Sequence, residues 1–322
     1  DKVGHLMNYG DGWYGGVFVS SMYTQAFLTD DIPTIISQAL KMIPEESHFH
    51  QCMSDVIKWH KENPDDWKAT WQLCQDKWTG EPGCPDGVFG DFNIDALVNS
   101  AYILIGLLYG EGDFGKTLEI STRCGQDSDC NPSSAAGILG TLLGYDTIPE
   151  EYLSCLRPVE GETLSYTSYS LNDVYQVSLK HALEMISRGG GKVKGDKIFI
   201  RKETPSPVRL EISFEGLKPK VFTGPKKTSG DTFEYNFEGC GVVVKGGFNK
   251  APADYTALLD VTVDGKFEKT VPPPASSLKR SNDLYWNFDL EAGPHTIVFQ
   301  LKNPSKDVRF VFRGALVYEK DE

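Results

Sequence analysis

The hydrophobic pattern of the chain changes its period at the triple glycine of residues 189–191. Before this point apolar residues recur every three to four positions, which is typical of helices. After it they alternate with polar residues, as in strands that have one face in a core. We therefore predict a multi-domain α and β protein, with a helical domain over residues 1–188, a linker over 189–195 and a β-sandwich over 196–322.

Helical spacing and capping signals divide the first part of the chain into separate segments. Two of them, residues 12–28 and 132–145, carry apolar residues on more than one face, so we expect interior helices. The triplet Thr29-Asp30-Asp31 is interpreted as a helix cap and not as a metal motif. The predicted helices cover residues 12–28, 32–43, 48–61, 65–78, 94–108, 114–122, 132–145 and 172–188, the last capped by Asn172.

Short alternating runs separated by turn residues fill the second part of the chain. Asp264-Gly265 between two such runs is a strong hairpin signal. Many short strands with turns between them indicate a β-sandwich. The predicted strands cover residues 208–214, 233–237, 256–263, 266–271, 284–290 and 297–301.

The most informative local feature is the acidic stretch RCGQDSDCN at residues 123–131. Asp127 and Asp129 are two residues apart, and in an extended segment such side chains point to the same side. Paired carboxylates are ligands that Mg²⁺, Mn²⁺ and Ca²⁺ prefer. Asn131 can cap the following helix and Pro132 suits its first turn. Taken alone, the pair is weak evidence for a metal site, and the capping interpretation is favoured, because Asp-rich loops before helices are common capping devices.

With its surroundings, this stretch resembles the ADP-ribosylglycohydrolase family. The resemblance covers about residues 1–157, including the segments 4–31 and 92–114. The matching positions in and after the acidic stretch are Gly125, Asp127, Asp129, Asn131, Ala135, Gly137, Gly140, Gly144 and Ile148-Pro149-Glu150.

The resemblance implies an all-α domain with two Mg²⁺ or Mn²⁺ ions that bind the distal ribose of ADP-ribose. Water then attacks the anomeric carbon and releases an N- or O-linked group. Asp127 and Asp129 match metal ligands, whereas Cys130 stands where a hydroxyl residue often supplies a ligand, and a thiol is a poor ligand for Mg²⁺. The family's Thr-Asp-Asp ligands and catalytic carboxylate are expected in a missing N-terminal segment, without which we expect no activity.

Several polar residues are candidates for substrate binding. His5 matches a histidine that lies near the substrate in relatives, but a lone histidine is more often a hydrogen-bonded structural group, and both interpretations stay open. Residues at the start of the 94–108 helix are interpreted either as a cap and a buried hydrogen-bonding group or as groups that face the metal site. The candidates are His5, Asp11, Gly12, Tyr14, Asn93, Asp95 and Asn99.

Composition limits the classes of partner. The chain has 32 basic and 45 acidic residues and a net charge of −13, without a basic block, which argues against nucleic acid. Apolar runs such as residues 101–108 are too short to span a bilayer. The seven cysteines include no CxxC motif and suit buried reduced thiols, although a Cys74–Cys84 bridge stays open.

The β region resembles galactose-binding-like jelly rolls that are appended to glycan-processing enzymes. Trp286, Tyr285 and Tyr255 are candidates for a sugar-stacking platform, but the alternating pattern favours core packing for Trp286. A non-catalytic scaffold that binds glycans through this region is the alternative to the enzyme. An appended domain of this kind also favours a periplasmic or secreted location.

Overall fold

A computed structural model describes residues 2–79, 85, 87–89, 92–228, 230–249, 255–273, 282–306 and 308–321. The chain forms two compact units. The helical unit contains Asp1–Gly80 and Asn93–Glu211, and the β unit contains Glu81–Phe92 and Ile212–Glu322. Residues 189–195, the predicted linker, therefore belong to the helical unit.

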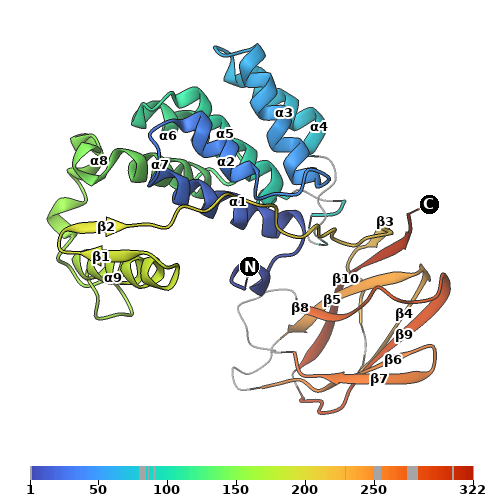
Figure 1. Cartoon of the computed structure of the whole chain (residues 1–322). Coiled ribbons are helices and arrows are strands. Elements are labelled where there is room, and N and C mark those ends of the chain that lie inside the picture. Colours follow the sequence, from blue (N-terminus) through green and yellow to red (C-terminus); the bar gives the residue numbers. More distant parts are fainter. Residues whose placement is uncertain are drawn as a thin grey trace. The chain divides into compact units, whose positions relative to one another are not determined.

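The helical unit follows the predicted order of helices, with ends shifted by a few residues (Figure 1). Three short 3₁₀ turns lie at Gly4–Leu6, Tyr145–Thr147 and Arg157–Val159. The helices are α1 Asp11–Ala26, α2 Ile32–Leu40, α3 His48–Glu62, α4 Trp67–Trp78, α5 Ala96–Gly110, α6 Phe114–Arg123, α7 Cys130–Leu143, α8 Glu150–Leu153 and α9 Leu171–Arg188.

Helix α5 is the centre of this unit. Every residue from Leu97 to Gly110 is buried, and the helix packs against α1 to α4, α6 and α7. Glycine permits close contact between α5 and α6, since a Cβ at Gly106 would lie 2.7 Å from the Cβ of Ser121 on α6. The core of the helical unit is therefore built around one completely enclosed helix.

Side-chain caps begin most of the long helices. The Asp31 carboxylate accepts from the Thr34 N–H at 2.9 Å, which confirms that Thr29-Asp30-Asp31 is a helix start. Helix α9 begins one residue earlier than predicted, because Ser170 and Asp173 form a capping box and Asn172 is not the cap.

The strand predicted at 208–214 does not form. This segment belongs with the helical unit up to Glu211, and the Val208 N–H donates to the Met42 carbonyl at 2.9 Å. Its exposure is opposite to the prediction, since Glu211 is 7% exposed while Leu210 is 47% and Ile212 is 50% exposed. The alternating pattern placed all of its apolar residues on the core side, whereas Glu211 is buried and, of the apolar residues up to Ile212, only Val208 packs partly buried against the core.

The β unit consists of two four-stranded antiparallel sheets with strand orders β3-β10-β5-β8 and β4-β9-β6-β7. Both sheets contribute to one apolar core, for example through Val242 and Phe312 from the first and Tyr235 and Val261 from the second. The strands are β3 Leu217–Thr223, β4 Thr232–Gly239, β5 Gly241–Asn249, β6 Leu259–Val263, β7 Lys266–Val271, β8 Asn282–Asn287, β9 Gly293–Leu301 and β10 Arg309–Lys320. A separate hairpin, β1 Lys192–Lys194 and β2 Lys197–Phe199, lies in the helical unit.

A hairpin turn and a β-bulge decide two local features of the β unit. The predicted hairpin at Asp264-Gly265 is confirmed, with φ of +48° and +77° at the two turn residues. The predicted core packing of Trp286 is wrong, since this residue is 53% exposed. A β-bulge opposite Val244 and Lys245 places both Leu284 and Tyr285 in the core, which turns Trp286 outward.

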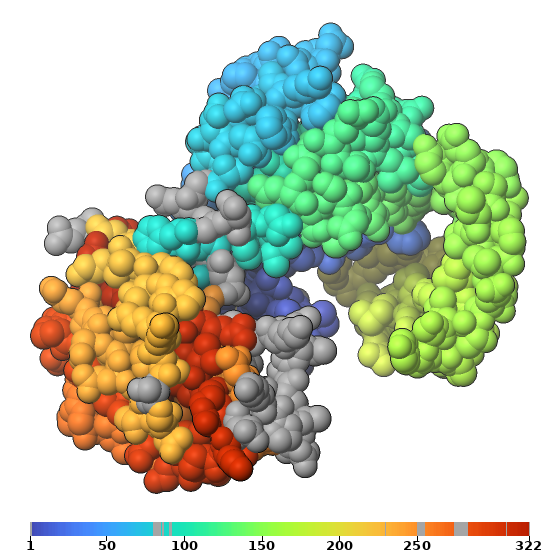
Figure 2. Space-filling model, turned by 180° about the vertical axis from the view of Figure 1, so that it is seen from behind, coloured from blue at the N-terminus to red at the C-terminus, as the bar shows by residue number. Residues whose placement is uncertain are grey.

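The C-terminal end of the helical unit is open. Helix α9 has no buried residue, and the segment from α8 to α9 projects as an arm with a hollow beside it (Figure 2). Among the described helices, none is both long and apolar enough to cross a membrane.

We predict that the β unit loses stability as the pH rises above neutrality. His295, with its side chain 10% exposed, binds Asp264 at 2.7 Å and the Glu291 carbonyl at 2.7 Å. Burial opposes its charge, but these two contacts prevail and raise the pKa of His295 above 6.5. Its contribution is therefore complete below pH 6.5 and is lost as the pH rises through the raised pKa.

Thermal melts of wild type and His295→Gln between pH 6 and 9 measure this effect. The stability difference between them should shrink with rising pH. A His181→Gln control, on exposed helix α9, should show no such trend, and a constant wild-type difference across the range would contradict the prediction.

Candidate metal centre

The acidic stretch forms the loop between α6 and α7. At its start the Trp71 indole N–H donates to the Cys124 carbonyl at 2.7 Å, which ties the loop to α4. Gly125 and Gln126 then adopt φ of +87° and +52°. The left-handed region suits glycine and is uncommon for glutamine, so this reversal is a strongly constrained part of the backbone.

Asp127, Asp129 and Cys130 lie together immediately after this reversal. One ligand atom from each falls within 4.8 Å of the other two, and no further group of three or more His, Cys, Asp or Glu residues meets this criterion in the described part of the chain. Asp127 is half-buried, while Asp129 and Cys130 are exposed. The fold therefore brings together Asp127 and Asp129, the two carboxylates whose spacing in the sequence predicted a pair.

The predicted role of Asn131 as a cap is wrong. Helix α7 begins at Cys130, with Asp129 as its N-cap residue, so Asn131 lies in the first turn and is 2% exposed. Its N–H donates to the Asp127 carbonyl at 3.0 Å as the helix begins. The side chain of Asn131 is consequently free to bond elsewhere in the interior.

The side-chain amide of Asn131 forms a hydrogen bond with Asn99 on α5. The Asn99 Oδ1 accepts from the Asn131 Nδ2 at 2.7 Å and from the Asp127 N–H at 3.2 Å. The Asn99 Nδ2 donates to the carbonyls of Asn93 at 3.2 Å and Asp95 at 2.9 Å. Asn99 is thus the buried hydrogen-bonding group of the first interpretation, and it contacts the acidic loop directly.

Hydrogen bonds and charges within the acidic group shift the pKa of two of its members. The Asp127 side chain and then the N–H groups of Asp129 and Cys130 lower the pKa of the Asp129 carboxyl. The bond to Asp127 and the charges of both aspartates raise the pKa of the Cys130 thiol. Cys130 therefore favours the neutral thiol, which is a weak ligand for a hard cation.

Asp95 and Asp11 serve as helix caps. Asp95 accepts from the Leu97 N–H at 2.8 Å, and Asp11 accepts from the Phe49 N–H at the start of α3 at 3.2 Å. Burial raises the pKa of both carboxyls. Asn93 is exposed and reaches the site through its carbonyl. A substrate-binding role for these residues stays a prediction.

His5 and Tyr14 meet a residue that the sequence did not single out, Glu211. The Glu211 carboxylate, 2% exposed, lies 3.1 Å from His5 Nε2, accepts from the Gly10 N–H at 2.8 Å and contacts Arg209 at 3.1 Å. The buried Tyr14 hydroxyl donates to the Arg209 carbonyl at 3.0 Å and accepts from the Glu211 N–H at 2.6 Å.

This arrangement fastens residues 209–211 to the N-terminal end of α1. Gly12 lies beside Asn8, since a Cβ there would be 2.9 Å from its Oδ1. No local signal marked Glu211, because a charged residue between apolar ones in an alternating run is ordinarily solvent-exposed.

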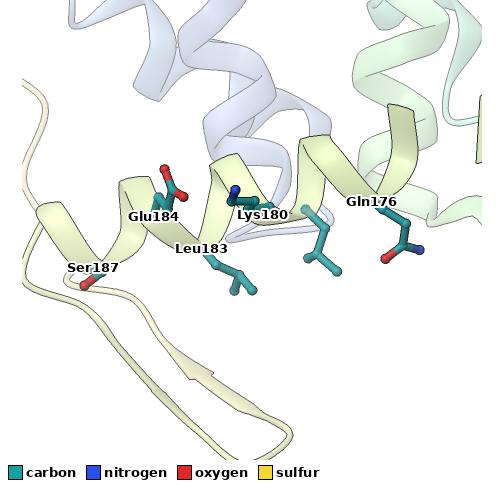
Figure 3. A pocket seen from close by; sticks show the side chains of 6 residues that line it. Gln176, Lys180, Leu183, Glu184 and Ser187 are labelled. Carbon is teal, nitrogen blue, oxygen red and sulfur yellow. The ribbon is translucent and has the colours of Figure 1, made fainter. Parts of the chain in front are cut away.

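A shallow depression on α9 lies apart from the acidic loop in sequence. All of its lining residues, including Leu179, Lys180, Leu183 and Glu184, come from this one helix, and the labelled side chains follow one another along its length (Figure 3). It is an open surface and not an enclosed cavity.

Among the cysteines, Cys52, Cys74, Cys124 and Cys240 are buried free thiols, and Cys130 and Cys155 are exposed free thiols. The open Cys74–Cys84 alternative involves Cys84, which lies outside the described residues.

Comparison with known families finds a match, which includes the acidic loop. The ADP-ribosylglycohydrolase profile matches residues 1–180, which is more than half of the chain. The chain belongs to the ADP-ribosylglycohydrolase family. A search of curated proteins finds no significant match.

The family match includes the acidic loop and the helices that support it, and it ends within α9. Glu211 and the entire β3–β10 region lie beyond it. The galactose-binding-like assignment of the β unit therefore stays a prediction.

We predict that Glu211→Gln destabilises the chain at pH 7 by about 1–3 kcal/mol, because the Gly10 N–H and His5 lose a buried charged acceptor. Burial opposes ionisation, but Gly10, His5 and Arg209 prevail and hold the pKa of Glu211 below 4.5. The stabilisation is present above pH 4.5 and is lost as the pH falls through the lowered pKa.

Urea denaturation of wild type and variant at several pH values between 3.5 and 7 measures this loss. Glu203→Gln is a matched control, because Glu203 pairs with Arg201 in the same segment but is 67% exposed. A Glu211→Gln variant as stable as the control at pH 7 would refute the assignment.

Proposed function

We propose that the chain carries part of the metal site of a hydrolase that cleaves the glycosidic bond of ADP-ribose or a related ribosyl conjugate. The observation that supports this proposal most directly is the pairing of Asp127 and Asp129 at the family's acidic loop. The family match supports glycohydrolase activity, while the metal and the substrate are our inference.

The residues present fit a divalent cation such as Mg²⁺ or Mn²⁺. Asp127 and Asp129 offer hard oxygen donors close together at the surface, and mutual repulsion of two ionised carboxylates is relieved by a cation. Such ions take about six ligands, more than this loop offers. We propose that the family's Thr-Asp-Asp segment supplies others and that activity requires it.

A bound divalent cation supplies positive charge that orients and acidifies water or ribose hydroxyls beside the anomeric carbon. The protein's own contribution is to hold the carboxylates in place. Asp127 is fixed through its backbone by Asn99, and Asp129 through its position at the start of α7. Cleavage develops positive charge at the anomeric carbon, which nearby carboxylates stabilise.

We expect calorimetric titration of Mn²⁺ into the chain to show binding that Asp127→Ala and Asp129→Ala each abolish, because each removes an oxygen ligand. Cys130→Ser should bind at least as tightly as wild type, because it replaces a protonated thiol by a hard oxygen. Release of ADP-ribose from N- and O-linked conjugates, measured with and without a supplied Thr-Asp-Asp segment, tests the activity.

Equal Mn²⁺ binding by wild type and both aspartate variants would remove the metal assignment. Turnover that is unaffected by Asp127→Ala and Asp129→Ala would remove the proposed role of the loop in hydrolysis.

A second candidate function is glycan binding by the β unit, independent of catalysis. The observation that favours it is the exposed Trp286 on edge strand β8, with the Lys269 ammonium 4.9 Å from its ring centroid. Exposed aromatic faces with adjacent hydrogen-bonding groups suit sugar rings. Tyr285 is buried, and the Tyr255 hydroxyl donates to the Asn303 carbonyl. Of the three aromatic residues predicted to stack on a sugar, we therefore propose only Trp286 as the contact.

Glycan-array binding by the full chain tests this candidate. We expect Trp286→Ala to lose at least about tenfold in affinity, the equivalent of 1.4 kcal/mol. Phe222→Ala, which alters an exposed aromatic on β3 at the opposite edge of the same sheet, should bind as wild type does. Equal affinity of the two variants would exclude Trp286 as the contact.

A further inference from the structure

The buried amide of Asn99 uses its entire hydrogen-bonding capacity. A primary amide offers two N–H donors and two acceptor lone pairs. Both Asn99 Nδ2 partners, the carbonyls of Asn93 and Asp95, only accept. The Asp127 N–H and the Asn131 amide group donate to Oδ1. The network therefore defines the orientation of this amide, since a flip would break all four bonds.

The two halves of the amide face different parts of the fold. The Nδ2 partners precede or begin α5, so these local bonds fix the direction of the side chain. The Oδ1 partners, Asp127 and Asn131, lie on either side of Asp129 in the sequence. One acceptor atom thus joins both ends of the turn that presents the carboxylates.

Without this connection, two features of the turn would favour a change in its conformation. Gln126 is held at positive φ, and two adjacent carboxylates repel one another when both are ionised. A loop that must be ordered when the ligand arrives binds less tightly than one already ordered, because the ordering entropy subtracts from the affinity. Asn99, 7% exposed on the enclosed helix α5, provides a rigid support.

We infer that Asn99 is a positioning residue for the divalent cation, and that its bonds to Asp127 and Asn131 set the spacing of the Asp127 and Asp129 carboxylates before the cation binds. This inference rests on the proposed metal site. It differs from a substrate-binding role for Asn99, because every polar atom of the amide is already bonded within the protein.

The test is Mn²⁺ titration of the full chain by calorimetry, with the spectrum of the bound ion recorded by electron paramagnetic resonance. Loss of a group that supports metal ligands ordinarily lowers affinity about 10–100-fold, which we expect for Asn99→Ala. Asn131→Ala should lose less, because the Asp127 contact remains. The double variant should bind no more weakly than Asn99→Ala, because both act through one oxygen atom.

Val98→Ala is the matched control for general destabilisation. Val98 neighbours Asn99 on α5 and is 1% exposed in the apolar core, so its truncation should lower the melting temperature without altering Mn²⁺ affinity or spectrum. Hydrogen exchange at residues 125–131 of the metal-free chain should accelerate in Asn99→Ala and not in Val98→Ala.

The outcomes separate the two proposals. Absence of Mn²⁺ binding by wild type would overturn the metal site and this inference together. Wild-type binding that Asp127→Ala abolishes but Asn99→Ala leaves unchanged would overturn only the positioning role. Equal losses in Asn99→Ala and Val98→Ala would also overturn it, since affinity would then follow stability alone.

Discussion

The complete enclosure of helix α5 is the constraint on which the helical unit depends. Its neighbours on nearly every side are other helices, so a polar side chain on it must find partners within the protein. Asn99 meets this requirement by bonding to its own helix start and to the acidic loop. The same burial that makes an unpaired amide unfavourable thereby fixes the loop that carries Asp127 and Asp129.

Two groups of carboxylates in the helical unit differ in their chemistry. In the first group, each carboxylate accepts a hydrogen bond from a backbone N–H at a helix start or in the turn before one; its members are Asp11, Asp95 and Glu211. Negative charge is stabilising in this position, because the N–H groups of a helix start lack partners within the helix. Asp127 and Asp129 instead lie against one another near the surface. Adjacent like charges destabilise a fold unless a proton or a cation is shared between them, and it is for this second group that we propose a metal.

Part of the fold and the pairing of the two aspartates could be predicted because their signals are local. The spacing of Asp127 and Asp129, the caps before α2 and α5, and the turn at Asp264-Gly265 each involve residues close in sequence. Asn99 was recognised only as a cap, a buried hydrogen-bonding group or a site residue, because its partners at 127 and 131 are distant in the chain. Glu211 was missed for the same reason. Its contacts with Gly10 and His5 span about two hundred residues, and no local pattern distinguishes it from an exposed charge.

The sequence by itself determined the division into a helical and an antiparallel β part, the order of the helices and the family, because periodicity, caps and a compact motif are properties of neighbouring residues. Tertiary structure decided which side of an element is buried wherever the period was interrupted. A bulge turned Trp286 outward, and packing of residues 208–211 against the helical unit brought Glu211 inward. It also decided that Asn131 bonds to Asn99 and does not cap α7. The physical reason is that burial and hydrogen-bond satisfaction are settled by contacts between distant segments, which one-dimensional patterns do not contain.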